Sequence, residues 1–224
     1  MKKARLFYPI KEIFLTLQGE GMHAGARAVF VRTSGCNVWS GREDHRARDM
    51  LKGCCAAWCD TDFNGIDGSN GGKLSATQIR DTVVRLWGEH EQAPMVVISG
   101  GEPGLVMDDA LVAALQNIGA DVHVETNGSQ QLPDVDWVTL SPKPPMGVKL
   151  NMLAINELKC VYPAGFDPLV YAKDLPLSIP RFIQPLDSKD AIVNQANHRA
   201  CIEFVHTNPE WRLSMQVHKV LGLP

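Results

Sequence analysis

Several features that would assign the chain to a broad class of protein are absent from its sequence. No run of about 18 apolar residues occurs, so we expect no membrane span. Apolar residues near the N-terminus are interrupted by Pro9, Lys11 and Glu12, which excludes the hydrophobic stretch of a signal peptide. No long run of Lys or Arg is present and the net charge is -3, so we expect no nucleic-acid partner. These absences predict a cytoplasmic protein.

The chain also lacks features that separate domains. It has no internal repeat, no low-complexity tract and no proline-rich linker. With 224 residues, of which 45% are hydrophobic, it can bury one sizeable core. We therefore predict a single domain over residues 1–224.

Short β-branched runs alternate with helical patterns along the chain. The predicted strands are residues 28–32, 95–99, 122–126, 137–140, 157–161 and 181–184. This alternation predicts an α/β fold with a mainly parallel sheet, which binds its ligands at the carboxyl ends of the strands.

Three of the predicted helices have recognisable ends. Ser75 and Gln78 form a capping box for the first, and Asp108 or Asp109 caps the second. The third is predicted over residues 189–205. Its apolar stripe is Ile192, Ala196, Ala200 and Phe204.

The most unusual local feature is a group of cysteines. Cys54, Cys55 and Cys59 lie close together in sequence, and Cys36 follows the first predicted strand. In a reducing compartment such thiols are more often metal ligands than disulfide partners. Adjacent cysteines do not easily ligate one zinc ion, whereas three thiolates suit an iron–sulfur cluster that keeps one iron open. The segment of residues 36–73 that carries them is too long for an idle connector.

Ordered motifs along nearly the whole chain resemble those of the radical S-adenosylmethionine enzymes. These motifs are GCN at 35–37, WCDTDF at 58–63, SGGEP at 99–103 and ETNG at 125–128. Three further features narrow the resemblance to the 7-carboxy-7-deazaguanine synthase family of the queuosine pathway. They are LQGEG at 17–21, an insertion that begins NVWSGRE at 37–43, and the tail WRLSMQVHK at 211–219.

The resemblance implies a fold and an activity. The fold is an incomplete (βα) barrel with an inserted cluster-binding loop at about residues 36–73 and a substrate-covering tail at about 211–224. The activity is that of a lyase that converts 6-carboxy-5,6,7,8-tetrahydropterin into 7-carboxy-7-deazaguanine with loss of ammonia. A radical derived from S-adenosylmethionine, rather than a catalytic side chain, carries this chemistry. The implied cofactors are a [4Fe–4S] cluster, S-adenosylmethionine and Mg²⁺, and the implied partners are an electron donor such as flavodoxin and a second copy in a homodimer.

The resemblance assigns three cysteines to the cluster. The usual signature places two residues between the last two cysteines, but Ala56, which has no ligating atom, stands where the middle cysteine belongs. The middle ligand is therefore Cys55 or Cys54, and we expect Cys55 because it needs the smaller rearrangement. The expected ligand set is Cys36, Cys55 and Cys59.

Contacts with the other cofactors are implied mainly at predicted strand ends. For S-adenosylmethionine they fall on Trp58, Gly100, Gly101, Glu102, Ser141, Pro142, Lys143, Gln184, Pro185, Leu186 and Asp187. For Mg²⁺ the implied ligand is Thr61, with substrate and water completing the coordination. Asp60 and Asp62 remain alternatives, because carboxylates are better Mg²⁺ ligands by residue type.

Substrate contacts are implied for Leu17, Gln18, Gly19, Glu20, Arg32, Ser99 and Pro224. The first of these segments can read the donor and acceptor edge of a pterin, and Glu20 can accept from a 2-amino-4-oxo pyrimidine ring. Arg32 can pair with a carboxylate, although a surface charge on an edge strand is the alternative. Pro224 is expected at the site because the tail of some family members returns there, and Gln216 and His218 either line the pocket or end a strand.

Two other functions compete with this interpretation. A glycyl-radical activating enzyme shares the cluster and the GGEP motif, but it has no pterin-reading LQGEG segment. A non-catalytic zinc module would use Cys36, Cys55 and Cys59 with a fourth ligand such as His45. Cys160 and Cys201 are expected to be core thiols.

Overall fold

The computed structural model describes residues 5–51, 54–143 and 154–224, without the side chain of Cys54. These residues form one nine-stranded sheet in the order β3-β1-β2-β4-β5-β6-β7-β8-β9. The strands are β1 (Tyr8–Leu17), β2 (Arg27–Thr33), β3 (Gly72–Leu74), β4 (Met95–Gly100), β5 (Asp121–Thr126), β6 (Trp137–Leu140), β7 (Glu157–Tyr162), β8 (Arg181–Pro185) and β9 (Trp211–Leu213). Strands β2 and β4 to β9 are parallel, whereas β1 runs antiparallel to β2 and β3. The sheet stays open between β3 and β9, as an incomplete barrel requires.

The six predicted strands are confirmed as β2 and β4 to β8. Strand β1 was not predicted, because Pro9, Lys11 and Glu12 interrupt its apolar pattern. Its side chains that face α2 and α3 are nevertheless buried, with Tyr8 and Ile10 both 0% exposed. Pairing of β1 with β2 and β3 makes β2 an internal strand.

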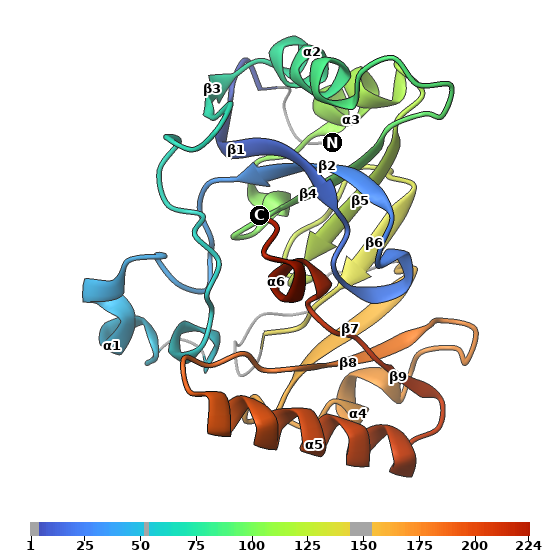
Figure 1. Ribbon diagram of the computed structural model, residues 1–224. Helices are drawn as coiled ribbons and strands as arrows, with labels where there is room; N and C mark the ends of the chain where they lie inside the picture. The colour runs from blue at the N-terminus through green and yellow to red at the C-terminus, as the bar shows by residue number, and fades with distance from the viewer. Residues whose placement is uncertain (1–4, 52–53, 144–153) are drawn as a thin grey trace.

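Helices cover the outer face of the sheet in two groups (Figure 1). Helices α2 (Ala76–Trp87) and α3 (Asp109–Gln116) pack over β1, β2, β4 and β5, and α4 (Leu169–Ala172) and α5 (Ala191–Thr207) pack over β7 to β9. Helix α6 (Val217–Leu221) lies in front of the strands, on the opposite side from α5. No helix in the described part of the chain has the length and apolar character of a membrane span.

The predicted helix starts are confirmed. The Ser75 hydroxyl accepts from the backbone N–H of Gln78 at 3.3 Å, and the Gln78 side chain accepts from the backbone N–H of Ser75 at 2.9 Å. The Asp108 carboxylate caps α3 at 3.1 Å from Leu111 N, and it also accepts from the Tyr8 hydroxyl at 2.6 Å. Asp108 therefore fixes the start of α3 against β1.

The predicted helix over residues 189–205 is confirmed as α5, and Phe204 of its predicted apolar stripe packs against the core, but the first part of the stripe is wrong. Ile192 is 79% exposed, whereas Asn197 and Cys201 are buried. The Asn197 side chain faces the sheet because it donates to the carbonyl of Leu186 at 2.7 Å, which satisfies a strand-end acceptor. Cys160 and Cys201 are both 0% exposed in the core beneath α5, which confirms them as core thiols.

Alternation along β7 places polar groups inside the barrel. Leu158 and Cys160 pack outward in the core beneath α5. Side chains two residues apart share a face of a strand, so Glu157, Lys159 and Val161 point the other way. Lys159 and Val161 line the cavity described below, and Lys159 is only 2% exposed.

Candidate active site

A cavity of about 280 Å³ opens at the carboxyl ends of the parallel strands. Three groups of predicted residues line it. The first is the cysteine segment, with Cys36, Cys55, Trp58, Cys59 and Thr61. The second comes from later strand ends, with Gly100, Gly101, Ser141, Lys143, Gln184, Pro185 and Asp187. The third is the predicted substrate set, with Leu17, Gln18, Glu20, Arg32, Ser99 and Pro224.

Four described residues predicted for the site are not in this lining: Gly19, Glu102, Pro142 and Leu186. Gly19 lies beneath His218, because a Cβ on Gly19 would come within 2.0 Å of His218 Nδ1. The backbone N–H of Leu186 donates to Tyr162 O at 2.8 Å, so its main chain extends the pairing of β7 with β8.

The three predicted cysteine ligands gather at one end of the cavity. Cys36, Cys55 and Cys59 pack with Trp39 and Phe63 in one apolar cluster, and Cys55 is 3% exposed. The Cys36 sulfur accepts from Val38 N at 3.4 Å, as a thiolate ligand of an iron–sulfur cluster commonly does. Burial raises the pKa of the Cys36 thiol, which binding to a cationic metal would reverse. These donors fit a cluster held by three thiolates.

A single metal ion fits the described side chains less well. Within residues 5–51, 54–143 and 154–224, no three His, Cys, Asp or Glu side chains converge on a point that could hold one ion. His45, the proposed fourth ligand of a zinc module, lies 3.4 Å from the Ser40 hydroxyl within the insertion. The side chain of Cys54, the alternative middle ligand, lies outside the described residues.

Paired glycines at the end of β4, Gly100 within the strand and Gly101 directly after it, allow the strand to approach the cysteine segment. A Cβ on Gly101 would come within 2.2 Å of Gly35 O and 2.7 Å of Cys36 Cβ. Gly100 has a φ of +136°, in a region that side chains other than glycine rarely adopt. Both glycines therefore place the end of β4 directly against the first cysteine.

Glu102 stabilises the strand ends from beneath the cavity. Its carboxylate is 0% exposed and accepts three hydrogen bonds of 2.8 Å, from Gly104 N, Thr126 Oγ1 and Asn127 N. Burial raises the pKa of Glu102 despite these donors. The carboxylate thus joins the segment after β4 to the end of β5, and its predicted contact with S-adenosylmethionine stays a prediction.

Arg46 connects the insertion to the last two cysteines. Its guanidinium lies 4.4 Å from the centre of the Trp39 ring and donates to Ala56 O and, at 3.3 Å, to Cys59 O. Glu43 pairs with the same guanidinium at 2.7 Å. Helix α1 (Arg46–Asp49) therefore stabilises the short helix of Cys54–Ala57.

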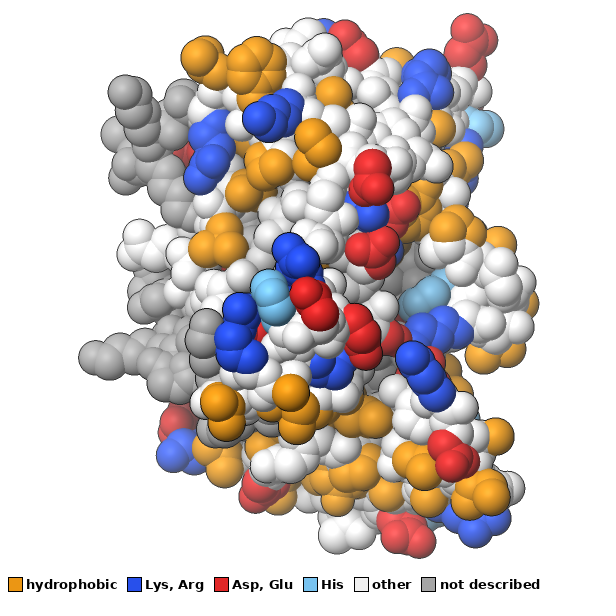
Figure 2. Space-filling view, turned by 90° about the vertical axis from the view of Figure 1, so that its left-hand side faces the viewer, with side chains coloured by type: hydrophobic (Ala, Val, Ile, Leu, Met, Phe, Trp, Pro, Cys, Tyr) orange, Lys and Arg blue, Asp and Glu red, His pale blue; other side chains and the backbone are white. Residues whose placement is uncertain are grey.

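On this side of the molecule positive and negative side chains are intermingled, and those drawn in colour form no patch of one sign (Figure 2).

We expect Arg46→Ala to loosen the cysteine segment. Loss of two carbonyl contacts and a ring contact should lower the free energy of unfolding by about 1–2 kcal/mol. Amide hydrogen exchange at residues 55–59 of the metal-free protein should accelerate. Arg42→Ala is the matched control, because Arg42 is more exposed and its side chain pairs, within the described part of the chain, only with Asp44. Equal exchange in the two variants would contradict this role.

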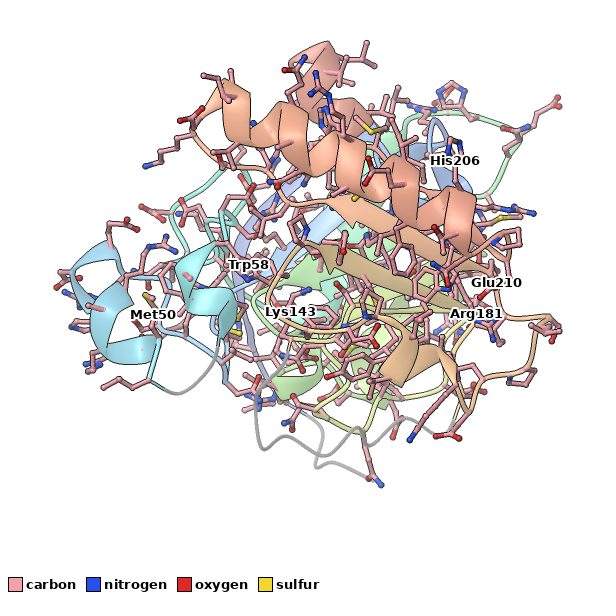
Figure 3. The ribbon with its side chains drawn as sticks, turned by 90° about the horizontal axis from the view of Figure 1, so that it is seen from below. Met50, Trp58, Lys143, Arg181, His206 and Glu210 are labelled. Carbon is pink, nitrogen blue, oxygen red and sulfur yellow. The ribbon has the colours of Figure 1, made fainter. Side chains whose placement is uncertain are left out.

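Trp58 and Lys143 meet beside the cysteines. The Lys143 ammonium lies 5.5 Å from the centre of the Trp58 ring and donates to Ser141 O at 3.1 Å and to the Ser141 hydroxyl. Figure 3 shows the two labelled side chains next to each other, far from Arg181 and Glu210 at the other end of α5. The end of β6 thereby contributes a cation to the cysteine end of the cavity.

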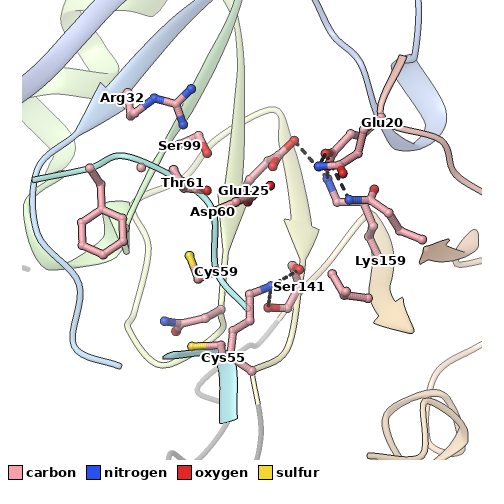
Figure 4. A pocket seen from close by; sticks show the side chains of 18 of the residues that line it. Glu20, Arg32, Cys55, Cys59, Asp60, Thr61, Ser99, Glu125, Ser141 and Lys159 are labelled. Atoms are coloured by element: carbon pink, nitrogen blue, oxygen red, sulfur yellow. Dashed lines mark hydrogen bonds and ion pairs between the residues drawn. The ribbon is translucent and has the colours of Figure 1, made fainter. Parts of the chain in front are cut away.

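The opposite wall of the cavity is a network of polar side chains (Figure 4). The Lys159 ammonium pairs with the Glu20 carboxylate and lies 3.3 Å from Glu125 Oε1. Burial disfavours ionisation of Glu20, but Lys159 outweighs it and lowers the Glu20 pKa. Burial lowers the pKa of His218, which also lines this wall, so its imidazole is neutral at neutral pH.

Sequence reasoning did not assign Glu125 and Lys159 to the site. The only available signals were the ETNG motif, which begins at Glu125, and a lysine in the middle of a buried strand. A buried strand lysine requires a carboxylate partner. The pairing itself depends on β5 and β7, which are separated by β6 in the sheet.

Arg32 faces the cavity from the neighbouring side. Its Nε donates to Glu12 at 2.7 Å, and its side chain is 20% exposed. Because β2 lies between β1 and β4, Arg32 is not a surface charge on an edge strand. Figure 4 shows Arg32 near Ser99 and Thr61, on the other side of the site from Glu20 and Lys159.

The two aspartates that flank Thr61 have partners of their own. Asp60 pairs with Lys219 of α6. Asp62 is 72% exposed on its side chain and lies 3.0 Å from Lys11. Thr61 and Asp60 line the cavity.

The C-terminal tail docks over the cavity. Val217 N donates to Gly19 O at 3.0 Å, and the Lys219 ammonium contacts Asp187 at 2.6 Å as well as Asp60. The Thr16 hydroxyl donates to Pro224 O at 3.3 Å. Gln216, His218, Lys219 and Pro224 all line the cavity.

Glu157, below Lys159 on the same strand, provides a test of the charge inside the barrel. Burial raises its pKa to about 6, so its contribution to stability is present at low pH and is lost as the pH rises through 6. Replacement by Gln preserves an acceptor for Met22 N, which lies 2.9 Å from Glu157 Oε2. Relative to the wild type, Glu157→Gln should gain about 2 kcal/mol of unfolding free energy between about pH 4 and pH 8. Urea unfolding across this range measures it, and parallel curves would contradict it.

An open parallel barrel with three cysteines at its carboxyl edge is the architecture of a radical S-adenosylmethionine enzyme. Similar proteins narrow the class. Proteins called 7-carboxy-7-deazaguanine synthase are 44% identical over 220 residues in Bradyrhizobium diazoefficiens (96% of this chain, 99% of the relative) and 45% identical over 220 residues in Caulobacter vibrioides (97% and 99%). This chain belongs to the 7-carboxy-7-deazaguanine synthase family.

A solved structure agrees with this assignment. The crystal structure of QueE from Escherichia coli matches with a TM-score of 0.68 and 28% identity, and the match covers 96% of each chain. No family model matches the chain. Members of this family are radical S-adenosylmethionine enzymes, so the chain uses an iron–sulfur cluster and S-adenosylmethionine.

Proposed function

We propose that this chain converts 6-carboxy-5,6,7,8-tetrahydropterin into 7-carboxy-7-deazaguanine and ammonia. One observation carries the proposal: a single cavity joins three cysteines, an arginine and a wall of carboxylates. The substrate has the matching pattern, since its pyrimidine ring carries N–H donors and its carboxylate lies at the other end of the molecule. Family membership supports the same reaction.

Cys36, Cys55 and Cys59 would hold a [4Fe–4S] cluster, and their shared apolar pocket supports this assignment. When bound, the cluster supplies the electron that cleaves S-adenosylmethionine into methionine and a 5'-deoxyadenosyl radical. The strand ends beside the cysteines would bind S-adenosylmethionine through Gly100, Gly101, Ser141, Lys143, Gln184, Pro185 and Asp187. Trp58 adds an aromatic wall next to Lys143.

The substrate would lie between Arg32 and Glu20. The free edge of the Arg32 guanidinium pairs with the substrate carboxylate, because Nε is already held by Glu12. Glu20, together with Leu17, Gln18 and the backbone of Gly19, reads the pyrimidine edge. Ser99 and the docked Pro224 complete the walls. The proposed reaction requires the carbon next to the carboxylate, from which hydrogen is taken, to face the cysteine end.

Thr61 would supply one protein ligand to Mg²⁺. The hydroxyl lines the cavity, whereas Asp60 and Asp62 already pair with lysines. Mg²⁺ keeps most of its waters and takes few protein ligands, so one hydroxyl suffices when the substrate carboxylate also binds.

The partners and compartment follow from the cofactor. A cluster of this kind requires a one-electron donor of low potential, such as flavodoxin, and thiols that remain free require a reducing compartment such as the cytoplasm. The expected homodimer stays part of this proposal.

The test is a reaction under anaerobic conditions. The reconstituted protein is incubated with reductant, S-adenosylmethionine, Mg²⁺ and the tetrahydropterin, and the products are separated by mass spectrometry. The proposal predicts 7-carboxy-7-deazaguanine in amounts exceeding the enzyme. Modification of a partner protein, with no deazapurine formed, would favour the activating-enzyme alternative.

A further inference from the structure

We propose that Lys159 is a positioning residue that holds the carboxylates of Glu20 and Glu125 in place, directed toward the pyrimidine edge of the substrate. The inference rests on the proposed function, because it assigns the substrate edge that these carboxylates meet. Lys159 itself would act through the two carboxylates rather than on a reacting atom.

Lys159 is placed at the meeting point of three chain segments. Its side chain is 3% exposed, and its ammonium contacts Glu20, from the segment after β1, and Glu125, from β5. In Figure 4 Glu20 lies on the same side of the site as the labelled lysine, and Glu125 lies between them and the middle of the site. One buried cation therefore sets the separation of two cavity carboxylates.

Side-chain amides of nearby glutamines determine which oxygens of Glu20 and Glu125 can still accept a hydrogen bond from the substrate. Gln184 and Gln216 donate to Glu20 Oε1 at 3.1 and 3.0 Å, and Lys159 occupies Oε2. Gln18 and Lys159 both contact Glu125 Oε1, at 3.1 and 3.3 Å. Among the described residues no donor contacts Glu125 Oε2, so this oxygen can accept from a substrate N–H.

The charge balance makes the lysine necessary. The titratable groups facing Lys159 are three carboxylates, Glu20, Glu125 and Glu157, and the imidazole of His218. Without the ammonium, three acids would share one barrel interior, and repulsion with burial would protonate at least one of them. A protonated carboxylic acid at the substrate edge would become a donor, which opposes the N–H edge of a pterin.

A purely structural ion pair is the competing explanation, because a buried pair also stabilises the fold when only one partner is lost. The positioning role and the purely structural role predict different effects when Lys159 is replaced. A positioning role changes substrate affinity and its pH dependence, whereas a structural role changes unfolding alone.

The experiment compares the reconstituted wild type, Lys159→Met and Lys159→Arg. We expect Lys159→Met to raise KM for the tetrahydropterin at least tenfold with a smaller change in kcat and in KM for S-adenosylmethionine. The acidic limb of kcat/KM against pH should move to higher pH. Lys159→Arg, which keeps the charge, should recover most of the affinity.

A further variant removes one carboxylate together with the lysine. The double variant Lys159→Met/Glu125→Gln removes one positive and one negative side chain, so the net charge inside the barrel stays that of the wild type. It therefore allows substrate affinity to be compared with the wild type even if Lys159→Met folds poorly. We expect the double variant to fold like the wild type and to lose the shifted acidic limb while KM stays raised. An unchanged KM and pH profile in folded Lys159→Met, or an unchanged KM in the double variant, would overturn the inference. Absence of deazapurine from the wild type itself would instead overturn the proposed function, and the inference with it.

Discussion

Cys55→Ala is expected to abolish cluster assembly and product formation. Cys55 is buried and shares an apolar pocket with Cys36 and Cys59, so its loss would leave two thiolates for the cluster. The loss of activity should exceed the roughly 10–100-fold typical of removing a group that only supports a metal ligand. Iron and sulfide content after anaerobic reconstitution, with the visible absorption of the cluster, measures the effect.

Two matched variants control for the loss of a thiol. Cys54→Ala tests the neighbouring cysteine, and Cys201→Ala removes a thiol from the core beneath α5. Both should keep iron and activity. Normal iron content in Cys55→Ala together with its loss in Cys54→Ala would assign the middle ligand to Cys54.

Glu102→Gln is expected to destabilise the strand ends rather than act on S-adenosylmethionine alone. The carboxylate accepts from three donors at 2.8 Å, and a glutamine would turn its NH₂ group toward at least one of them. A buried donor facing another donor should lower the free energy of unfolding by about 2–4 kcal/mol. Urea unfolding of the cluster-free protein measures this directly.

Glu91→Gln is the matched control, because Glu91 is exposed in the loop after α2 and should tolerate the change within about 0.5 kcal/mol. If Glu102→Gln were as stable as this control but bound S-adenosylmethionine much more weakly, the carboxylate would contact the cofactor directly. The structural role described above would then be wrong.

Local sequence patterns were sufficient to predict most strands and the starts of two helices, because hydrophobic patterns and capping residues are visible in a short stretch of sequence. The β-branched runs became strands, and the caps at Ser75 and Asp108 formed as expected. Strand β1 was not predicted, because its burial comes from pairing with β2 and packing beneath α2 and α3. These contacts join distant parts of the chain and leave no local sequence pattern. Part of the predicted apolar stripe of α5 was wrong for a related reason. The buried face includes Asn197, whose side chain donates a hydrogen bond to the carbonyl of Leu186, directly after the end of β8.

The residues of the site likewise divide into those that a local sequence pattern could place and those that depend on contacts between distant parts of the chain. Cys36 and the glycines at the end of β4 were expected at a strand end because each follows or ends a recognisable strand, whereas Arg32 was expected at the site only from the family resemblance. The pairing of Lys159 with Glu20 and Glu125 could not be predicted, because it joins residues separated by 139 positions in the first case. The docking of Lys219 on Asp60 likewise depends on a contact across 159 positions, which periodicity does not reveal.

The most direct test of the proposed reaction follows a hydrogen atom. The reconstituted protein is supplied with tetrahydropterin that carries deuterium at C6, and the deazapurine, the recovered S-adenosylmethionine and any 5'-deoxyadenosine are analysed by mass spectrometry. Because the deazapurine and ammonia together contain every atom of the substrate, a hydrogen atom must return from 5'-deoxyadenosine to the substrate radical. We therefore expect 7-carboxy-7-deazaguanine together with deuterium at the 5' carbon of the recovered S-adenosylmethionine and of any released 5'-deoxyadenosine. Unlabelled 5'-deoxyadenosine without any deazapurine would contradict it.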